Sequence, residues 1–339
     1  MSGDGSSRSV RPMRHAPTLS RRLFLAGAAA GAASAIAVPS FGRAEAPTAV
    51  RIGFQRSSTL TSLLKSDGSL EKALGERGVT VSWHEFTSGL PLLESLNIGN
   101  IDFSADVADT VPVFAQAAGA KLVFVAEEAP SPSAQAILVQ SGSDIASVEQ
   151  LKGRKVAVTK GAGSHFLLLA ALAKAGLSIK DVTPAYLTPA DGRAAFSTAK
   201  VDAVVIWEPF ISSIQAQSGA RVLADGSGGL ASYKRYYLAT KDFSERGSAV
   251  LDTIVGRLKA AGESVKSDPK PAAERLAPLW AMDAATVEKA NARRSYKVGA
   301  VTREGLAEQQ TIADAFFAEG LFPKKVDAAD AAIWTPSAG

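Results

Sequence analysis

The chain has 339 residues, of which 46% are hydrophobic and 21% charged, enough length and apolar side chain for two domains or one large domain. It contains no cysteine, which excludes disulfides, thiolate metal sites, iron–sulfur clusters and a lipid anchor on a cysteine. The net charge of +4 and the pI of ≈ 9.2 would suit a nucleic-acid partner, but six arginines and one aspartate lie in the first 44 residues. The remainder carries 31 basic and 32 acidic residues, so its charge points neither to nucleic acid nor to a membrane surface.

The N-terminal segment has the layout of an export signal. Arg21 and Arg22 stand directly before a short apolar stretch, an arrangement typical of a twin-arginine signal. That stretch is too short and too rich in alanine and glycine for a stable membrane span, and a disordered basic tail is the alternative. We predict cleavage after Ala44 rather than after Ala46. Residues 1–44 would then be the signal peptide, and the rest a soluble periplasmic protein.

Beyond the signal, short strand and helix patterns alternate, which predicts a mainly parallel α/β architecture. The expected strands cover residues 49–54, 79–86, 101–107, 121–126, 134–139, 155–159, 182–187, 203–207, 221–224 and 236–240. The expected helices cover residues 60–77, 90–96, 111–118, 148–151, 164–174, 192–199 and 210–217, and from residue 242 onward the pattern is almost entirely helical.

Two α/β units joined by two extended strands indicate a protein of two lobes, each a mostly parallel sheet flanked by helices. We predict a first lobe over 45–135, a second lobe over 136–238, and a return to the first lobe with C-terminal helices over 239–339. Ligands of open α/β sheets lie beyond the carboxyl ends of the strands, and pockets favour the interface between lobes. The residues that follow each strand are therefore the candidates for a site.

Two turns of the first unit place small and polar residues at expected helix starts. After the first strand, Ser58 or Thr59 can cap a helix whose free N–H groups face the cleft, and Arg56 supplies a bidentate cation suited to an oxyanion. A plain cap with a solvated arginine is the alternative. After the second strand, Ser88 and Gly89 again precede a helix, which predicts a second cluster of free N–H groups.

The third turn of this unit carries two carboxylates, Asp106 and Asp109, before a helix with Pro112 in its first turn. Asp109 is most simply the cap of that helix. The pair could do acid–base chemistry, but no serine or cysteine nucleophile stands beside a plausible histidine and aspartate anywhere in the chain. No catalytic set emerges, so we predict a binding protein rather than an enzyme.

In the second unit, KGAGSHF at residues 160–166 joins a strand to a helix. It lacks the spacing of a Walker A loop and of GxGxxG, and what remains is a short nest of N–H groups suited to a small anion. Lys160 can add charge or point to solvent, and His165 can donate to a ligand or be satisfied within the fold. Trp207, at the end of a later strand, can form an apolar wall or belong to the core. Only His84 and His165 follow the signal, so no metal site is expected.

Seven segments carry a resemblance to a known family: IGFQRSSTL, TSGLPLLESLNIGNIDF, VPVFAQAAGA, LKGRKVAVTKGAGSHFLLLAAL, TPADGRAAF, VDAVVIWEPF and EQQTIADAFF. Together they resemble the aliphatic sulfonate-binding proteins of ABC importers, relatives of the taurine- and nitrate-binding proteins. The resemblance runs from about Ile52 to Trp334, which is nearly all of the chain after the signal.

This resemblance implies a two-lobed periplasmic binding protein of type II with two crossover strands. Such a protein would capture an organic sulfonate and deliver it to an inner-membrane permease driven by a cytoplasmic ATPase, for sulfur acquisition. It would be a monomer without a cofactor or a metal. Taurine, nitrate or bicarbonate are alternative ligands of the same fold. A periplasmic enzyme and a ligand-sensing subunit of a membrane receptor are alternatives of other classes.

The family's ligand loops fall on or beside Arg193 and the fourteen residues that we expect to bind the ligand: Gln55, Arg56, Thr59, Ser88, Gly89, Leu90, Asp109, Thr110, Gly163, Ser164, His165, Asp191, Trp207 and Glu208. The sequence departs from the family pattern at Arg56, where a lysine is usual. The third loop is one residue longer, lacks its first proline and adds Asp106. A carboxylate beside an anion site is unfavourable unless it is paired, so Asp106 would either read an amine on the ligand, as in taurine, or point away.

Overall fold

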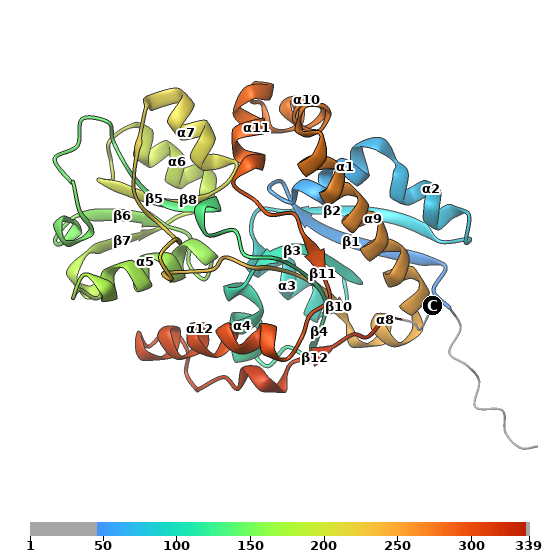
Figure 1. The fold of residues 1–339 in the computed structure, drawn as a ribbon. Coiled ribbons are helices and arrows are strands. Elements are labelled where there is room, and N and C mark those ends of the chain that lie inside the picture. The colour runs from blue at the N-terminus through green and yellow to red at the C-terminus, as the bar shows by residue number, and fades with distance from the viewer. Residues whose placement is uncertain (1–45, 337–339) are drawn as a thin grey trace, which may run out of the picture. The chain divides into compact units, whose positions relative to one another are not determined.

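The computed structural model describes residues 46–336, so the predicted signal peptide lies outside the described part of the chain. The described residues belong to one compact unit, whose strands form two β-sheets (Figure 1). Among the described residues, no helix is long and apolar enough to cross a membrane.

The first sheet has 7 strands in the order β11-β4-β10-β3-β1-β2, with β12 paired to β4. β1 runs parallel to both β2 and β3, whereas β10 lies antiparallel between β3 and β4. Its strands are β1 (Ala49–Gln55), β2 (Thr80–Phe86), β3 (Phe103–Ala108), β4 (Leu122–Glu128), β10 (Arg235–Thr240), β11 (Val298–Gly299) and β12 (Ala332–Ile333).

Helices from both ends of the described chain surround this sheet. They are α1 (Thr59–Asp67), α2 (Ser69–Gly75), α3 (Gly89–Asn97), α4 (Thr110–Ala117), α8 (Lys241–Arg246), α9 (Ser248–Ser267), α10 (Pro269–Trp280), α11 (Ala284–Ala292) and α12 (Ala307–Ala318). We call the first sheet with α1–α4 and α8–α11 the first lobe. Helix α12 belongs to neither lobe alone, because it packs against helices of both sheets.

The second sheet has 5 strands in the order β7-β6-β8-β5-β9. Its elements, which form the second lobe, are β5 (Gln135–Val139), β6 (Lys155–Val158), α5 (Gly163–Lys174), β7 (Thr183–Tyr186), α6 (Pro189–Ser197), β8 (Ala203–Trp207), α7 (Phe210–Ser218) and β9 (Arg221–Asp225). Short 3₁₀ turns at Pro132–Ala134, Val148–Leu151, Ile179–Asp181, Glu304–Leu306 and Ala328–Asp330 join elements of the chain. Figure 1 shows α5 on one face of this sheet and α6 and α7 on the other.

Two segments of the chain cross between the sheets, at residues 129–134 and 226–234, and the backbone N–H of Ser131 donates to the carbonyl of Ser232 at 2.9 Å. Each crossing leads into an antiparallel strand: β5 enters the second sheet after the first crossing, and β10 returns to the first sheet after the second. The return occurs at Arg235, earlier than the boundary expected after residue 238, because β10 is already paired with β3 and β4 from its first residue.

Two local expectations are corrected by the structure. The helix expected over 60–77 is two helices, because Gly68 takes a left-handed φ of +65° between α1 and α2. The C-terminal region is not all helix: β11 and β12 each add two residues to the edge of the first sheet beside β4.

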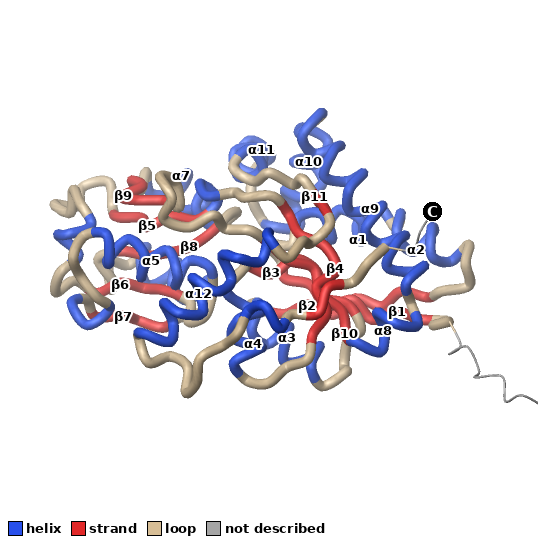
Figure 2. Tube along the Cα trace, turned by 60° about the horizontal axis from the view of Figure 1, so that its bottom comes forward, coloured by secondary structure: helices blue, strands red, loops and turns tan. Residues whose placement is uncertain are grey.

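Helix α12 packs against helices of both sheets, as Figure 2 shows beside α4 and α5. Phe316 of α12 lies with its ring centroid 4.8 Å from that of Phe114 in α4 and 5.2 Å from that of His165 in α5. The same apolar cluster includes Val113 of α4 and Leu169 of α5. The carboxyl ends of β1, β3, β6 and β8 lie close to one another, and the site lies there.

Candidate functional site

A cavity lies at the carboxyl ends of strands from both sheets, where ligands of open α/β sheets bind. The last residues of β1, β3 and β8, the β6–α5 turn and the starts of α3, α4 and α5 contribute to it. The end of the second crossing and the first residue of β10 complete it. The lining residues are Gln55, Ser88, Gly89, Leu90, Ala108, Val111, Thr159, Lys160, Gly161, Ala162, Gly163, Trp207, Tyr233 and Arg235.

Two helix N-termini open into this cavity, one from each lobe. α3 begins at Gly89 and α5 begins at Gly163, and both residues line the cavity. The first N–H groups of a helix have no acceptor within it, and neither helix here receives a hydrogen bond from its capping side chain. Aligned peptide dipoles add partial positive charge at both ends, so the two helices present N–H donors to the same small space.

The turn between β6 and α5 is held rigidly around Gly161, whose φ of +74° is left-handed. Its N–H donates to His165 Nδ1 at 3.2 Å, and its carbonyl accepts from Thr110 Oγ1, in the first lobe, at 2.7 Å. Burial, followed by the charge of Lys160, lowers the pKa of His165 to about 4, so the imidazole is neutral and Nδ1 can accept. The turn therefore directs both polar groups of Gly161 to protein partners.

Ser164 and His165 lie just behind the lining. Both side chains are buried, and Ser164 Oγ and His165 Nε2 have no hydrogen-bond partner among the described residues. An unpartnered buried hydroxyl in the first turn of α5 is available to a group that enters beside it. The His165 ring instead packs between the rings of Tyr186 and Phe316, at centroid distances of 5.4 and 5.2 Å.

Apolar groups cover the rest of the cavity wall, mainly Leu90 and Val111 from the first lobe and Trp207 from the second. Trp207 also reaches across, since its Nε1 donates to Ser57 Oγ at 3.4 Å. The cavity thus combines a polar end formed by helix starts with an apolar side, which suits a ligand that has one anionic head and one organic group.

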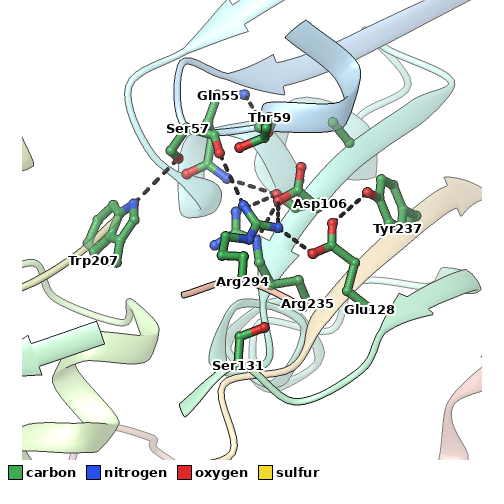
Figure 3. A network of polar contacts seen from close by, with 12 residues as sticks. Gln55, Ser57, Thr59, Asp106, Glu128, Ser131, Trp207, Arg235, Tyr237 and Arg294 are labelled. Carbon is green, nitrogen blue, oxygen red and sulfur yellow. Dashed lines mark hydrogen bonds and ion pairs between the residues drawn. The ribbon is translucent and has the colours of Figure 1, made fainter. Parts of the chain in front are cut away.

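A cation, Arg235, also lines the cavity, and Figure 3 shows the network that holds it. Its Nε is ion-paired with Asp106 Oδ2, its Nη2 donates to the Asp106 carbonyl at 2.9 Å, and its Nη1 donates to Tyr233 Oη at 2.8 Å. Arg235 and Asp106 are almost completely buried. These contacts fix the plane of the guanidinium at the cavity wall.

A second buried pair continues this network away from the cavity. Arg294 Nη2 donates to Asp106 Oδ2 at 3.1 Å and is ion-paired with Glu128, which accepts from Tyr237 Oη at 2.7 Å (Figure 3). Two arginines thus face two carboxylates. Both arginines contact Asp106 Oδ2, whereas Asp106 Oδ1 has no partner among the described residues. Asp106 does not line the cavity, so of the two alternatives expected for this carboxylate the structure favours pairing within the protein.

The structure brings six of the fourteen expected site residues to the cavity wall: Gln55, Ser88, Gly89, Leu90, Gly163 and Trp207. Ser164, His165 and Thr110 lie directly behind the β6–α5 turn, as described above. The remaining five lie elsewhere, each with a protein partner.

Arg56 and Thr59 face away from the cavity. The side chain of Arg56 is 64% exposed and its Nε lies 3.4 Å from Glu85 Oε1, so the cation predicted for the anion site is on the surface. Thr59 Oγ1 instead accepts from Tyr296 Oη at 2.9 Å. Gln55, the last residue of β1, lines the cavity, but no residue of the following turn does. The backbone of that turn folds back, with the Ser58 N–H donating to the Gln55 carbonyl.

The three expected carboxylates are structural. Asp109 accepts from the backbone N–H of Lys234 at 3.1 Å, and Glu208 accepts from Ser212 Oγ at 2.9 Å. Asp191 is exposed and accepts from Thr188 Oγ1 at 2.7 Å. Burial, followed by the charge of Glu308, raises the pKa of Asp109 to about 7.

Sequence reasoning missed two residues of the cavity wall: Tyr233, at the end of the second crossing, and Arg235, the first residue of β10. The sequence did carry a signal for Arg235, because it stands at the start of a buried strand, Arg235–Thr240. A charged side chain in a buried strand must be paired with an opposite charge or lie at a binding site. Tyr233 takes a left-handed φ of +53°, which is uncommon outside glycine and marks the end of the crossing segment.

Comparison with known proteins places this geometry in context. A family model described as NMT1/THI5 like matches residues 75–272. A protein of Escherichia coli (strain K12) named for binding aliphatic sulfonates is 40% identical over 317 residues, covering 93% of this chain and 96% of that protein.

Two solved structures share the fold closely. The alkanesulfonate-binding protein of Xanthomonas axonopodis pv. citri, bound to MOPS, is 38% identical with a TM-score of 0.80, covering 86% of this chain and 99% of that one. The periplasmic aliphatic sulphonate-binding protein of Escherichia coli is 40% identical with a TM-score of 0.77, covering 86% and 94%.

Proposed function

The chain belongs to the NMT1/THI5-like family and, within it, to the aliphatic sulfonate-binding proteins, and from this premise we propose that it captures an aliphatic sulfonate for an ABC importer. One observation carries the proposal: the N-termini of α3 and α5, from different lobes, open into one cavity that has an apolar side.

The proposed seat of the headgroup is the polar end of the cavity. A sulfonate has one charge shared by three oxygens, so it needs several donors rather than one counter-ion. The N–H groups at the start of α3 approach from one lobe and those at the start of α5 from the other, and Gln55 lies between them on the wall. Hydrogen bonds to an ionised acceptor are roughly twice as strong as neutral ones.

Arg235 is the proposed third source of donors. A guanidinium carries five N–H groups, and three of those of Arg235 are engaged by Asp106 and Tyr233. The remaining N–H groups are available to an oxygen in the cavity, and the Asp106 contacts keep them oriented. Because Asp106 balances the charge of Arg235, the site favours a monoanion over a dianion.

The organic group of the ligand would rest against Leu90, Val111 and Trp207. Sulfate would place its fourth oxygen against this wall, where it would have no donor. An unsatisfied buried polar group costs about 1–3 kcal/mol, which is about 5- to 150-fold in affinity. The apolar wall is therefore the basis for preferring alkanesulfonates to sulfate and to nitrate.

Binding without chemical conversion, with closure of the lobes around the ligand, completes the proposal. We propose a monomer exported by the twin-arginine signal of residues 1–44. In the periplasm it would pass the ligand to an inner-membrane permease with a cytoplasmic ATPase, in sulfur acquisition.

Calorimetric titration of the purified chain tests this function. The ligands are ethanesulfonate, 1-butanesulfonate, taurine, sulfate and nitrate, and NMR of the recovered ligand reports any conversion. We expect both alkanesulfonates to bind and to be recovered unchanged, sulfate and nitrate to bind far more weakly, and taurine to gain nothing from its amine. Folded protein that binds no sulfonate would refute the proposal, and a converted ligand would replace it with an enzyme.

A further inference from the structure

Thr110 makes a direct hydrogen bond between the lobes at the ligand cavity, although it does not line the cavity. It is the first residue of α4 in the first lobe and is fully buried. Its Oγ1 donates to the carbonyl of Gly161, in the β6–α5 turn of the second lobe, at 2.7 Å. A distance of 2.7 Å is that of a well-formed hydrogen bond.

This bond sets the orientation of the turn beside the proposed headgroup seat. The Gly161 carbonyl would repel an anion if it faced the cavity, but Thr110 holds it toward the first lobe. The Gly161 N–H is held by His165 Nδ1. With both groups of Gly161 engaged, the backbone donors that remain for a ligand are the N–H groups of Gly163 and Ser164, since the His165 N–H donates to the Ala162 carbonyl at 2.9 Å.

The bond can exist only when the two lobes lie together. In a separated state the hydroxyl of Thr110 and the carbonyl of Gly161 would each bind water, at little loss. In the closed state they are buried, so a missing donor leaves the carbonyl unsatisfied. The hydrogen bond of Thr110 therefore stabilises only the closed state, whereas a hydrogen bond within one lobe stabilises the open and closed states equally.

From this geometry we propose that Thr110 is a positioning residue, a latch whose hydroxyl closes the first lobe onto the β6–α5 turn and strengthens ligand binding without touching the ligand. The inference rests on the proposed function, because the ligand is the anion that the closed cavity retains. It changes the role of Thr110 from the ligand contact expected from the sequence to an interlobe contact.

Substitution at Thr110 separates the hydroxyl from the methyl group. Thr110→Val keeps the shape and removes the donor, and Thr110→Ser keeps the donor and removes the methyl group. With 1-butanesulfonate, we expect Thr110→Val to raise the Kd about tenfold through a faster dissociation rate, with an unchanged association rate. Thr110→Ser should restore the wild-type Kd.

Thr61→Val is the matched control. Thr61 is also a buried threonine of the first lobe, on α1, and its Oγ1 has no partner among the described residues. The same chemical change there should leave the Kd unaltered. A Kd unchanged in Thr110→Val, or failure of Thr110→Ser to rescue, would overturn the latch.

A second readout does not need a ligand. Since the chain has no cysteine, spin labels can be placed at Ile98→Cys in the first lobe and Val222→Cys in the second, whose parent residues are 70% and 41% exposed. Thr110→Val should shift the interlobe distances toward longer values, and identical distributions in wild type and variant would overturn the latch. If the wild-type protein binds no sulfonate, the proposed function is refuted but the latch is not. The distance measurement still tests the latch, because it needs no ligand.

Discussion

Gly163, the first residue of α5, lies where the two lobes touch, and its replacement by alanine tests whether closure forms the site. A Cβ at this position would lie 2.6 Å from Tyr233 Cε2, 2.8 Å from Tyr233 Cδ2 and 3.2 Å from Ala108 Cβ. Tyr233 belongs to the second crossing and Ala108 to the first lobe, so the added methyl group meets atoms outside its own lobe. Two of these distances are below any normal carbon–carbon contact.

The magnitude follows from two opposing effects. Alanine favours a helix over glycine by up to about 1 kcal/mol, and this gain applies whether the lobes are closed or separated. Overpacking a tight contact costs about 1–3 kcal/mol, and this cost applies only when α5 meets Tyr233 and Ala108. We therefore expect Gly163→Ala to bind 1-butanesulfonate about 5- to 150-fold more weakly, with an equal or higher Tm in the absence of ligand.

The assay is calorimetric titration combined with a thermal melt of the ligand-free protein. Gly256→Ala in α9 is the matched control, since nothing lies within 4 Å of its added Cβ, and it should keep wild-type affinity. Wild-type affinity in Gly163→Ala would show that α5 does not approach the first lobe in the bound state. A lowered Tm without ligand would show that the contact belongs to the folded protein regardless of closure.

Two further predictions concern Asp109 and Arg56, which we expected at the site from the sequence and which the structure places elsewhere. Asp109→Asn should raise the Tm at pH 8 but hardly at pH 4. Burial and the charge of Glu308 raise the pKa of Asp109 from 3.8 to about 7, so between these pH values the native state keeps a proton that the unfolded chain loses. The stability of the wild-type protein therefore falls as the pH rises through this range, whereas that of the asparagine variant does not. A Tm difference that is constant with pH would contradict this account. Arg56→Gln should leave the Kd for 1-butanesulfonate unchanged in calorimetry, because its side chain is exposed and paired with Glu85; a large loss of affinity would place Arg56 at the ligand.

Most of the fold could be predicted because the signals are local. Strands and helices of ordinary length can be recognised by the spacing of their apolar residues, and the alternation of strands with helices limits the possible topologies. The two-residue strands β11 and β12 have no such pattern, since tertiary pairing with β4 alone defines them. The start of the return strand at Arg235 was also missed, because a charged residue does not look like part of a buried strand.

Some residues of the site could likewise be predicted from local sequence, and others could not. Gly89 and Gly163 were predictable, since a helix start is read from neighbouring residues. Arg235 was not, because what makes it a buried cation at the cavity is Asp106, 129 positions earlier in the chain. Arg56 was placed wrongly for the converse reason: its position after a strand is local, but the direction of its side chain depends on Glu85 of the neighbouring strand β2.

The most direct test of the account is a crystal structure of the protein with 1-butanesulfonate. We expect the sulfonate oxygens to lie within hydrogen-bond distance of N–H groups at the starts of both α3 and α5, with the butyl group against Trp207. A sulfonate bound at only one helix start, reversed so that its butyl group faces the helix starts, or bound outside this cavity would contradict the claim that two lobes supply one anion site.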